Sequence, residues 1–290
     1  MTDELTLVDA VPALADFNLS PEMHATLSEM LASMTTPPEG IHDTDWRWEP
    51  ELVKIKAATT SDPKCPGHTE LGDLWTPSQV LWSADNDGPK KPWGFIPVEY
   101  WWSHAMFEAG GGSNRPECSS DNGIITREGL LCADCKHLPW KGSAKLYPGK
   151  AQTACANARN FLVLDAKLTG FYHLRLSGGS NKAANDMLRA VKGSLSGRVW
   201  GLTSTPVERK GKKWREYAMS MTGEAVDPAI VAFCAMVRGH KAAQIQDEVA
   251  NLMIERDEAL AIASGDLADP DAIDALQDAV EGPGGFSESM

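Results

Sequence analysis

The sequence predicts an α+β protein with a small β-barrel core, an inserted loop region and C-terminal helices. Four segments have the alternating or β-branched composition of strands, and they lie at 160–166, 170–176, 198–207 and 214–221. An amphipathic helix is predicted between the second and third of them, at 181–195. Residues 110–156 are rich in Gly, Pro and Cys and show no helical period. A loop of that length inside a compact domain needs something to organise it.

Residues 1–45 are predicted to form an acidic N-terminal arm with one short helix. Ser20 precedes Pro21, the order expected of a helix N-cap and the first helical position. Apolar residues then recur at helical spacing as far as Met34, and a Thr-Thr-Pro-Pro run follows them.

Residues 46–102 contain seven of the ten tryptophans and many turn signals. Trp93–Trp102 is predicted to be a strand, because aromatic and β-branched residues surround its single proline. With this segment counted first, the order is three strands, a helix and two strands. A five-stranded oligonucleotide/oligosaccharide-binding (OB) barrel has its helix between strands three and four, so an OB-like barrel with residues 103–158 inserted fits. Small α+β domains of other topology share the order.

The C-terminal part of the chain is predicted to be helical and then acidic. Residues 228–263 have helical spacing, with Gly239 as a candidate break between two helices. Residues 266–290 cannot bury enough apolar surface to fold alone, so we expect a disordered acidic tail. The predicted organisation is an acidic arm at 1–45, a Trp-rich segment plus OB-like domain at 46–222, a helical segment at 223–265 and a tail at 266–290.

Charge is segregated along the 290 residues. Residues 90–217 hold 20 Lys and Arg against 10 Asp and Glu, whereas the rest holds 7 against 30. The net charge of -13 therefore combines a basic body with acidic flanks, a pattern typical of nucleic-acid binding as well as of acidic solvated helices. The start Met1–Glu4 lacks the basic and apolar parts of a signal peptide, and no apolar run approaches the roughly 20 residues that span a bilayer. We expect a cytoplasmic protein with no membrane partner.

Four cysteines have the spacing C-x13-C-x2-C-x19-C, at Cys118, Cys132, Cys135 and Cys155. A C-x2-C pair suits a tetrahedral zinc site, and four thiolates would make that zinc structural. We therefore expect a zinc knuckle at 114–158. His137 could replace one cysteine, Cys65 and His68 are another possible ligand pair, and a chain without metal is the remaining alternative.

The motif around these cysteines resembles a family of bacteriophage and prophage single-stranded-DNA-binding proteins. The matching residues are Cys118–Gly123, Cys132–Cys135, Trp140–Gly142, Gly149–Lys150, Cys155 and Arg159. The pattern is C-SSD-G…C-x2-C…W-G…GK…C…R, and the resemblance covers about residues 114–222. This chain has four residues between Gly-Lys and Cys, where the family has two or fewer. The resemblance implies a role in phage DNA replication or recombination.

Single-strand binding needs cations for phosphates and aromatic faces for bases. The predicted nucleic-acid-binding residues, all in the basic body, are Lys136, Trp140, Lys141, Lys145, Lys150, Arg159, Arg175, Arg198, Trp200, Arg209, Lys210, Lys212, Lys213, Trp214 and Arg215. Period-two alternation puts Arg198 and Trp200 on one strand face. The run 208–213 would be a basic hairpin arm.

These features favour single-stranded DNA as the partner, with RNA possible. They also predict contacts between the acidic tail and replication or recombination proteins. No deaminase signature, P-loop or G-x-S-x-G motif occurs, so we expect no enzymatic activity. The alternative function is a zinc-containing adaptor that binds proteins of a replication or transcription complex.

Overall fold

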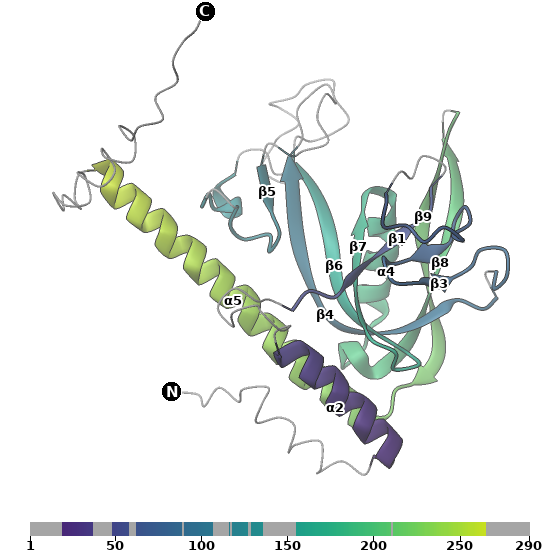
Figure 1. Ribbon diagram of the computed structural model, residues 1–290. Helices are drawn as coiled ribbons and strands as arrows, with labels where there is room; N and C mark the ends of the chain where they lie inside the picture. The colour runs from purple at the N-terminus through teal and green to yellow at the C-terminus, as the bar shows by residue number, and fades with distance from the viewer. Residues whose placement is uncertain are drawn as a thin grey trace, which may run out of the picture.

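The computed structural model describes residues 19–36, 48–57, 62–88, 90–106, 116, 118–126, 129–135, 155–209 and 211–264. One strongly curled β-sheet forms its centre, with helix α4 inside the curl and helices α2 and α5 on the opposite, convex face (Figure 1). The α+β class and a curled, half-barrel sheet followed by a C-terminal helix are therefore confirmed.

The sheet is mixed, because β1 and β7 run parallel while the other pairs are antiparallel. Its order is β3-β2-β1-β7-β6-β4-β8-β9, with β5 added to β4. The strands are β1 (Glu51–Ile55), β2 (Leu74–Trp75), β3 (Val80–Trp82), β4 (Trp93–Met106), β5 (Cys118–Ser120), β6 (Cys155–Asp165), β7 (Phe171–Ser177), β8 (Arg198–Arg209) and β9 (Lys212–Ala225).

Strand β4 is the centre of the sheet and confirms the strand predicted from Trp93. It extends past the predicted end, Trp102, to Met106, because β6 pairs with it from Phe95 to Met106. The register shifts between Pro97 and Glu99, where proline cannot donate to the ladder. The shift is tied to α5, because Arg238 donates to the carbonyl of Val98 at 2.8 Å and lies 3.6 Å from the Glu99 carboxylate.

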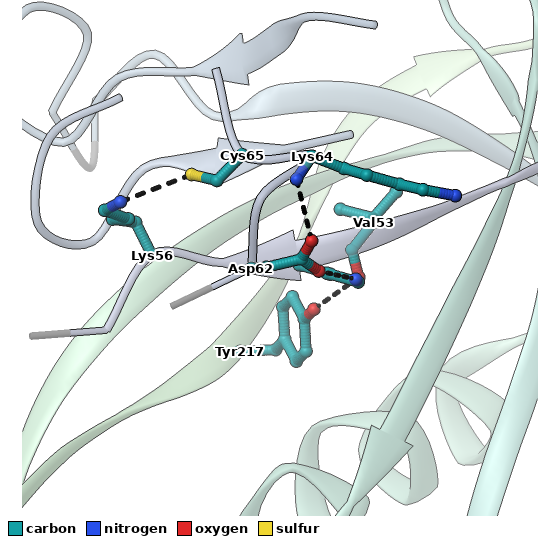
Figure 2. Close-up of polar contacts among 7 residues, drawn as sticks. Val53, Lys56, Asp62, Lys64, Cys65 and Tyr217 are labelled. Carbon is teal, nitrogen blue, oxygen red and sulfur yellow. Dashed lines mark hydrogen bonds and ion pairs between the residues drawn. The ribbon is translucent and has the colours of Figure 1, made fainter. Parts of the chain in front are cut away.

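The curl brings the two ends of the sheet together. Tyr217 on β9 donates its hydroxyl to the carbonyl of Val53 on β1 at 2.7 Å, and Figure 2 shows its ring beside that strand. Next to this contact, Asp62 forms an ion pair with Lys54 and accepts from the Lys64 backbone at 2.9 Å (Figure 2). The hydrogen bond from Lys54, with the one from Lys64, lowers the pKa of the Asp62 carboxyl. Strand β1, which was not predicted from the sequence, therefore lies against β9 where the sheet curls.

Helices α2 (Pro21–Thr35) and α5 (Pro228–Ser264) cover the convex face. Ser20 caps α2 as predicted, because its side chain accepts from the Met23 backbone at 3.2 Å and Pro21 occupies the first turn. Phe233 of α5 is fully buried against this face. Gly239 does not divide α5, which continues through it as one helix and past the edge of the sheet (Figure 1).

Helix α4 (Asn181–Ala190) packs inside the curl through Ala184 and Met187. It ends five residues earlier than predicted, because Val191 is extended and Gly193 adopts φ +87°, a conformation that favours glycine. Trp82, Trp93 and Trp200 are buried in the same inner core, which explains part of the tryptophan excess.

Candidate nucleic-acid interface

The C-terminal half of β4 carries aromatic side chains on both faces of the sheet. Side chains alternate along a strand, and directly paired residues share a face. Tyr100 pairs with Phe161 of the inner core, so Tyr100 lies on the concave face. Trp102, opposite Arg159, and His104 share that face. We call Tyr100, Trp102, His104 and Arg159 the aromatic row.

The aromatic row stacks a cation on an exposed indole. The Arg159 guanidinium carbon lies 3.9 Å from the centroid of Trp102, and the His104 ring is nearly parallel to Trp102 at 6.5 Å. Tyr100 is 41% exposed and Trp102 is 37% exposed, so both present ring surface to solvent. This combination of a guanidinium and accessible ring faces is suited to phosphate and base contacts.

Burial lowers the pKa of two groups in the aromatic row, Arg159 and His104. It lowers the pKa of the Arg159 guanidinium, which starts so high that the group stays a cation at neutral pH. The buried Nε atom of Arg159 has no hydrogen-bond partner within the described part of the chain. Burial also lowers the pKa of His104. Its hydrogen bond of 2.9 Å to Asn157 acts in the opposite direction and has the smaller effect. The row therefore presents one permanent charge, at Arg159.

A second exposed tryptophan, Trp214 on β9, lies near the segment that leads into helix α4. Its Nε1 donates to Glu216 at 2.8 Å, and that carboxylate lies so close to Gly179 that a Cβ there would meet it at 1.8 Å. Just beyond, Asn181 at the start of α4 donates to the carbonyl of Asn157 at 3.1 Å. Asn157 in turn contacts the aromatic row. The two exposed tryptophans thus flank the N-terminal end of α4.

The predicted cations divide between the two faces and the ends of the sheet. Arg159 belongs to the aromatic row, whereas Arg175 is exposed on the convex face, opposite Asn160. Arg198 donates to the carbonyl of Gly223 at 3.1 Å, at the beginning of β8. Trp200 is only 4% exposed and belongs to the inner core. Its ring therefore has no accessible face on which a base could stack, as the predicted role requires.

The predicted basic hairpin joins β8 and β9. Lys213 lies 3.7 Å from the carboxylate of Glu208, and Arg215 donates to Ser204 at 3.3 Å. Backbone atoms of Arg209 and Lys212 pair across the hairpin, but their side chains are outside the described part. The other predicted cations and Trp140 lie outside the described residues, namely Lys136, Trp140, Lys141, Lys145, Lys150 and Lys210.

The prediction of a structural zinc centre is wrong. All four cysteines are described and none of them forms a disulfide, and the described residues hold no group of three or more His, Cys, Asp or Glu able to hold a metal ion. Cys118 and Cys155 both pair with Met106 from opposite sides, so strand β4 separates them. The backbones of the two strands that carry Cys118 and Cys155 are therefore two strand spacings apart, about 10 Å.

Burial raises the pKa of two thiols in this segment. It raises the pKa of Cys155 to about 11, with a smaller contribution from the other three cysteines. It likewise raises the pKa of Cys132. His137 lies outside the described residues.

Sequence reasoning missed Tyr100, Trp102 and His104 as site residues. The signal was present, because Tyr-Trp-Trp-Ser-His at 100–104 alternates at the end of a predicted strand. The missing information was the pairing partner, since only the register with β6 puts Arg159 over Trp102.

No protein-family model matches the chain, and no curated protein and no solved structure matches it either. Among the described residues, no helix is long and apolar enough to span a membrane.

Proposed function

We propose that the protein binds single-stranded DNA across the opening of its curled sheet and has no enzymatic activity. The observation that carries this proposal is the Arg159 guanidinium, stacked 3.9 Å from the centroid of the exposed Trp102 ring. Exposed Tyr100 lies on the same face, and Trp214 is a further exposed ring, on β9.

Bases would stack on the accessible aromatic rings while Arg159 contacts phosphate. Stacking contributes about 1–3 kcal/mol per base and is tolerant of sequence, because every base has a flat face. The protein would therefore bind with little sequence preference. Each phosphate contact would add about -0.7 to the slope of log affinity against log salt.

An OB-like barrel is the fold interpretation that agrees best with this function. In support, five strands follow the expected order, with α4 between the third and the fourth, and the sheet is strongly curled. Strand β1 occupies the place beside β7, which makes the sheet larger than a five-stranded barrel.

The biological setting we propose is a replication or recombination module of a bacteriophage, in the host-cell cytoplasm. The support for it is the sequence resemblance at residues 114–222, without its zinc. RNA is a possible second ligand. The acidic residues 266–290 would contact partner proteins once DNA occupies the basic surface.

The test is fluorescence anisotropy of a labelled poly-dT oligonucleotide, titrated with full-length protein. Trp102→Ala should weaken binding by about 5- to 100-fold, from the loss of one stacking platform. The control is Leu71→Ala, because Leu71 is 50% exposed and lies outside the aromatic row. No binding by the folded wild-type protein, or equal effects of the two variants, would contradict the proposal.

A protein-binding adaptor is the second candidate. The observation that favours it is a set of exposed apolar side chains, two of them beside Gly123 and Gly129 and two on α5, namely Ile124, Leu130, Met253 and Ile254. The chain reaches the helix at Gly129, where a Cβ would lie 3.0 Å from Arg256. If the folded protein does not bind the oligonucleotide, we would assign the function to this apolar surface instead.

A further inference from the structure

A cavity of about 850 Å³ lies on the convex face of the sheet and plays no part in the proposed interface. Residues of segment 48–52, of strands β4, β6 and β7 and of helix α5 line it. Trp101 and Asn160 are cross-strand partners that line the cavity, so they point away from the face of Trp102. The volume falls within the range of roughly 300–1,000 Å³ that is typical of small-molecule sites.

The floor of the cavity is a chain of hydrogen bonds. Asn160 donates its amide nitrogen to Ser103 at 2.9 Å, and its oxygen faces Nε2 of His173 at 3.0 Å. An amide oxygen can only accept, so His173 donates from Nε2. Burial, with Lys241 and Arg175, lowers the pKa of His173 to about 4, so the ring is neutral at pH 7. Its Nδ1 is then an acceptor, and the Ser103 hydroxyl is a donor.

Asn122 adds a donor that has no partner among the described residues. The residue is 6% exposed and lines the cavity. Its Oδ1 accepts from the Ile124 and Ile125 backbone at 2.9 and 3.0 Å and from Ser120 at 3.1 Å. Its buried Nδ2 makes no hydrogen bond within the described part of the chain. An unpaired buried donor costs about 1–3 kcal/mol, a cost that an acceptor on a ligand would remove.

The walls of the cavity favour a flat ligand without negative charge. Trp48 and Trp101 supply aromatic surface, and Trp101 is stacked on His173 at 5.3 Å and 22°. The charged lining residues are Glu49, Asp121, Asp247 and Glu248 against Arg175 and Lys241. Carboxylates outnumber cations, so a phosphate or carboxylate ligand would be repelled.

We propose that this cavity binds an uncharged nucleobase, with Asn122 Nδ2 and the Ser103 hydroxyl donating to its acceptors and His173 accepting from its exocyclic or ring N–H. The inference goes beyond the proposed interface, because it concerns the other face of the sheet. The base could belong to a free nucleoside or to a nucleotide of a bound strand.

The test is calorimetric titration of the full-length protein with adenosine, guanosine, cytidine and thymidine. At least one nucleoside should bind, and Asn122→Asp should weaken it by about tenfold, because the aspartate keeps the accepting oxygen and removes the donor. Asn86→Asp is the matched control, since Asn86 is exposed and lies outside the cavity. Ile245→Trp, which fills the cavity from α5, should abolish binding and serves if Asn122→Asp does not fold.

Two further comparisons identify the source of the base. If Asn122→Asp and Ile245→Trp also weaken homopolymeric oligonucleotides of one base, the site takes a base of the strand; unchanged oligonucleotide affinity indicates a free nucleoside. Trp102→Ala should leave nucleoside binding unchanged, which separates this site from the interface. The proposal is overturned if no nucleoside binds and both cavity variants leave oligonucleotide affinity unchanged. It is also overturned if a nucleoside monophosphate binds more tightly than its nucleoside.

Discussion

At the scale of single residues, the stacked pair of Arg159 and Trp102 decides how the interface would work. Lysine at position 159 keeps the charge but lacks the flat guanidinium that covers the indole. Arg159→Lys should therefore weaken single-strand binding about 3- to 10-fold without changing the salt slope. Arg159→Ala should weaken it further and make the slope shallower by about 0.7, since one phosphate contact is lost. Anisotropy titrations over a series of KCl concentrations measure both quantities.

The control for this comparison is Lys167→Ala. Lys167 is exposed in the turn that joins β6 to β7, at the opposite end of β6 from Arg159. If Lys167→Ala and Arg159→Ala have equal effects, the binding is diffuse electrostatic attraction and the stacked pair has no special role.

His173 gives the protein a predictable response to acid. Its pKa of about 4 in the folded state, set mainly by burial, lies below the ordinary value near 6.5, so the unfolded chain takes up the proton first. The stabilising contribution is complete above about pH 6.5 and is lost as the pH falls toward 4. The free energy of unfolding should decrease by up to ~2 kcal/mol between pH 7 and pH 5 from this group.

Urea denaturation of the wild-type protein and of His173→Gln at both pH values tests this expectation. The variant should lose that part of the pH dependence, because glutamine does not titrate. An identical pH dependence in the two proteins would show that other groups cause it.

At the scale of secondary-structure elements, the feature of α5 that differs from the prediction is its continuity through Gly239. A glycine within a helix costs about 0.5–1 kcal/mol relative to alanine, yet α5 passes through Gly239. A Cβ at this exposed position would meet nothing within 4 Å. Gly239→Ala should therefore raise the free energy of unfolding by about 0.5–1 kcal/mol in urea denaturation. The contrasting control is Gly211→Ala, which should destabilise, because Gly211 has φ +73°.

The sequence predicted those parts of the fold whose signal lies within one element, and not those that depend on contacts between distant segments. Period-two and 3.6-residue patterns located β4, β6, β7, α4, β8 and β9, because these elements bury their own periodic side chains. Strands β2 and β3 have only two and three residues, too few for a period to emerge. Cysteine spacing predicted a metal site, but spacing carries no information on the strand that separates Cys118 from Cys155.

At the scale of the whole molecule, a single strand serves two surfaces. Trp101 and Trp102 are adjacent in β4, so their side chains project to opposite faces of the sheet. The concave face carries the aromatic row, and the convex face carries the cavity beneath α5. The closure between Tyr217 and Val53 holds the curl that gives the concave face its shape.

The segregation of charge leads to a prediction about the complete chain. Residues 266–290 contain seven acidic and no basic residues, and the last described element, α5, ends before them at Ser264. A tethered polyanion competes with DNA for basic surface at high local concentration, and salt screens that competition. A protein that ends at Gly265 should bind a poly-dT oligonucleotide several-fold more tightly than the full chain at low salt, with the difference disappearing at high salt.

The matched control is a full-length chain in which the seven acidic residues are replaced by Asn and Gln. It keeps the length of the tail and removes its charge, so it should bind like the shortened protein if electrostatic competition is the cause. If it binds like the wild-type chain, the tail occludes the site by its bulk. If shortening leaves the affinity unchanged at every salt concentration, the acidic segment does not compete for the DNA-binding surface.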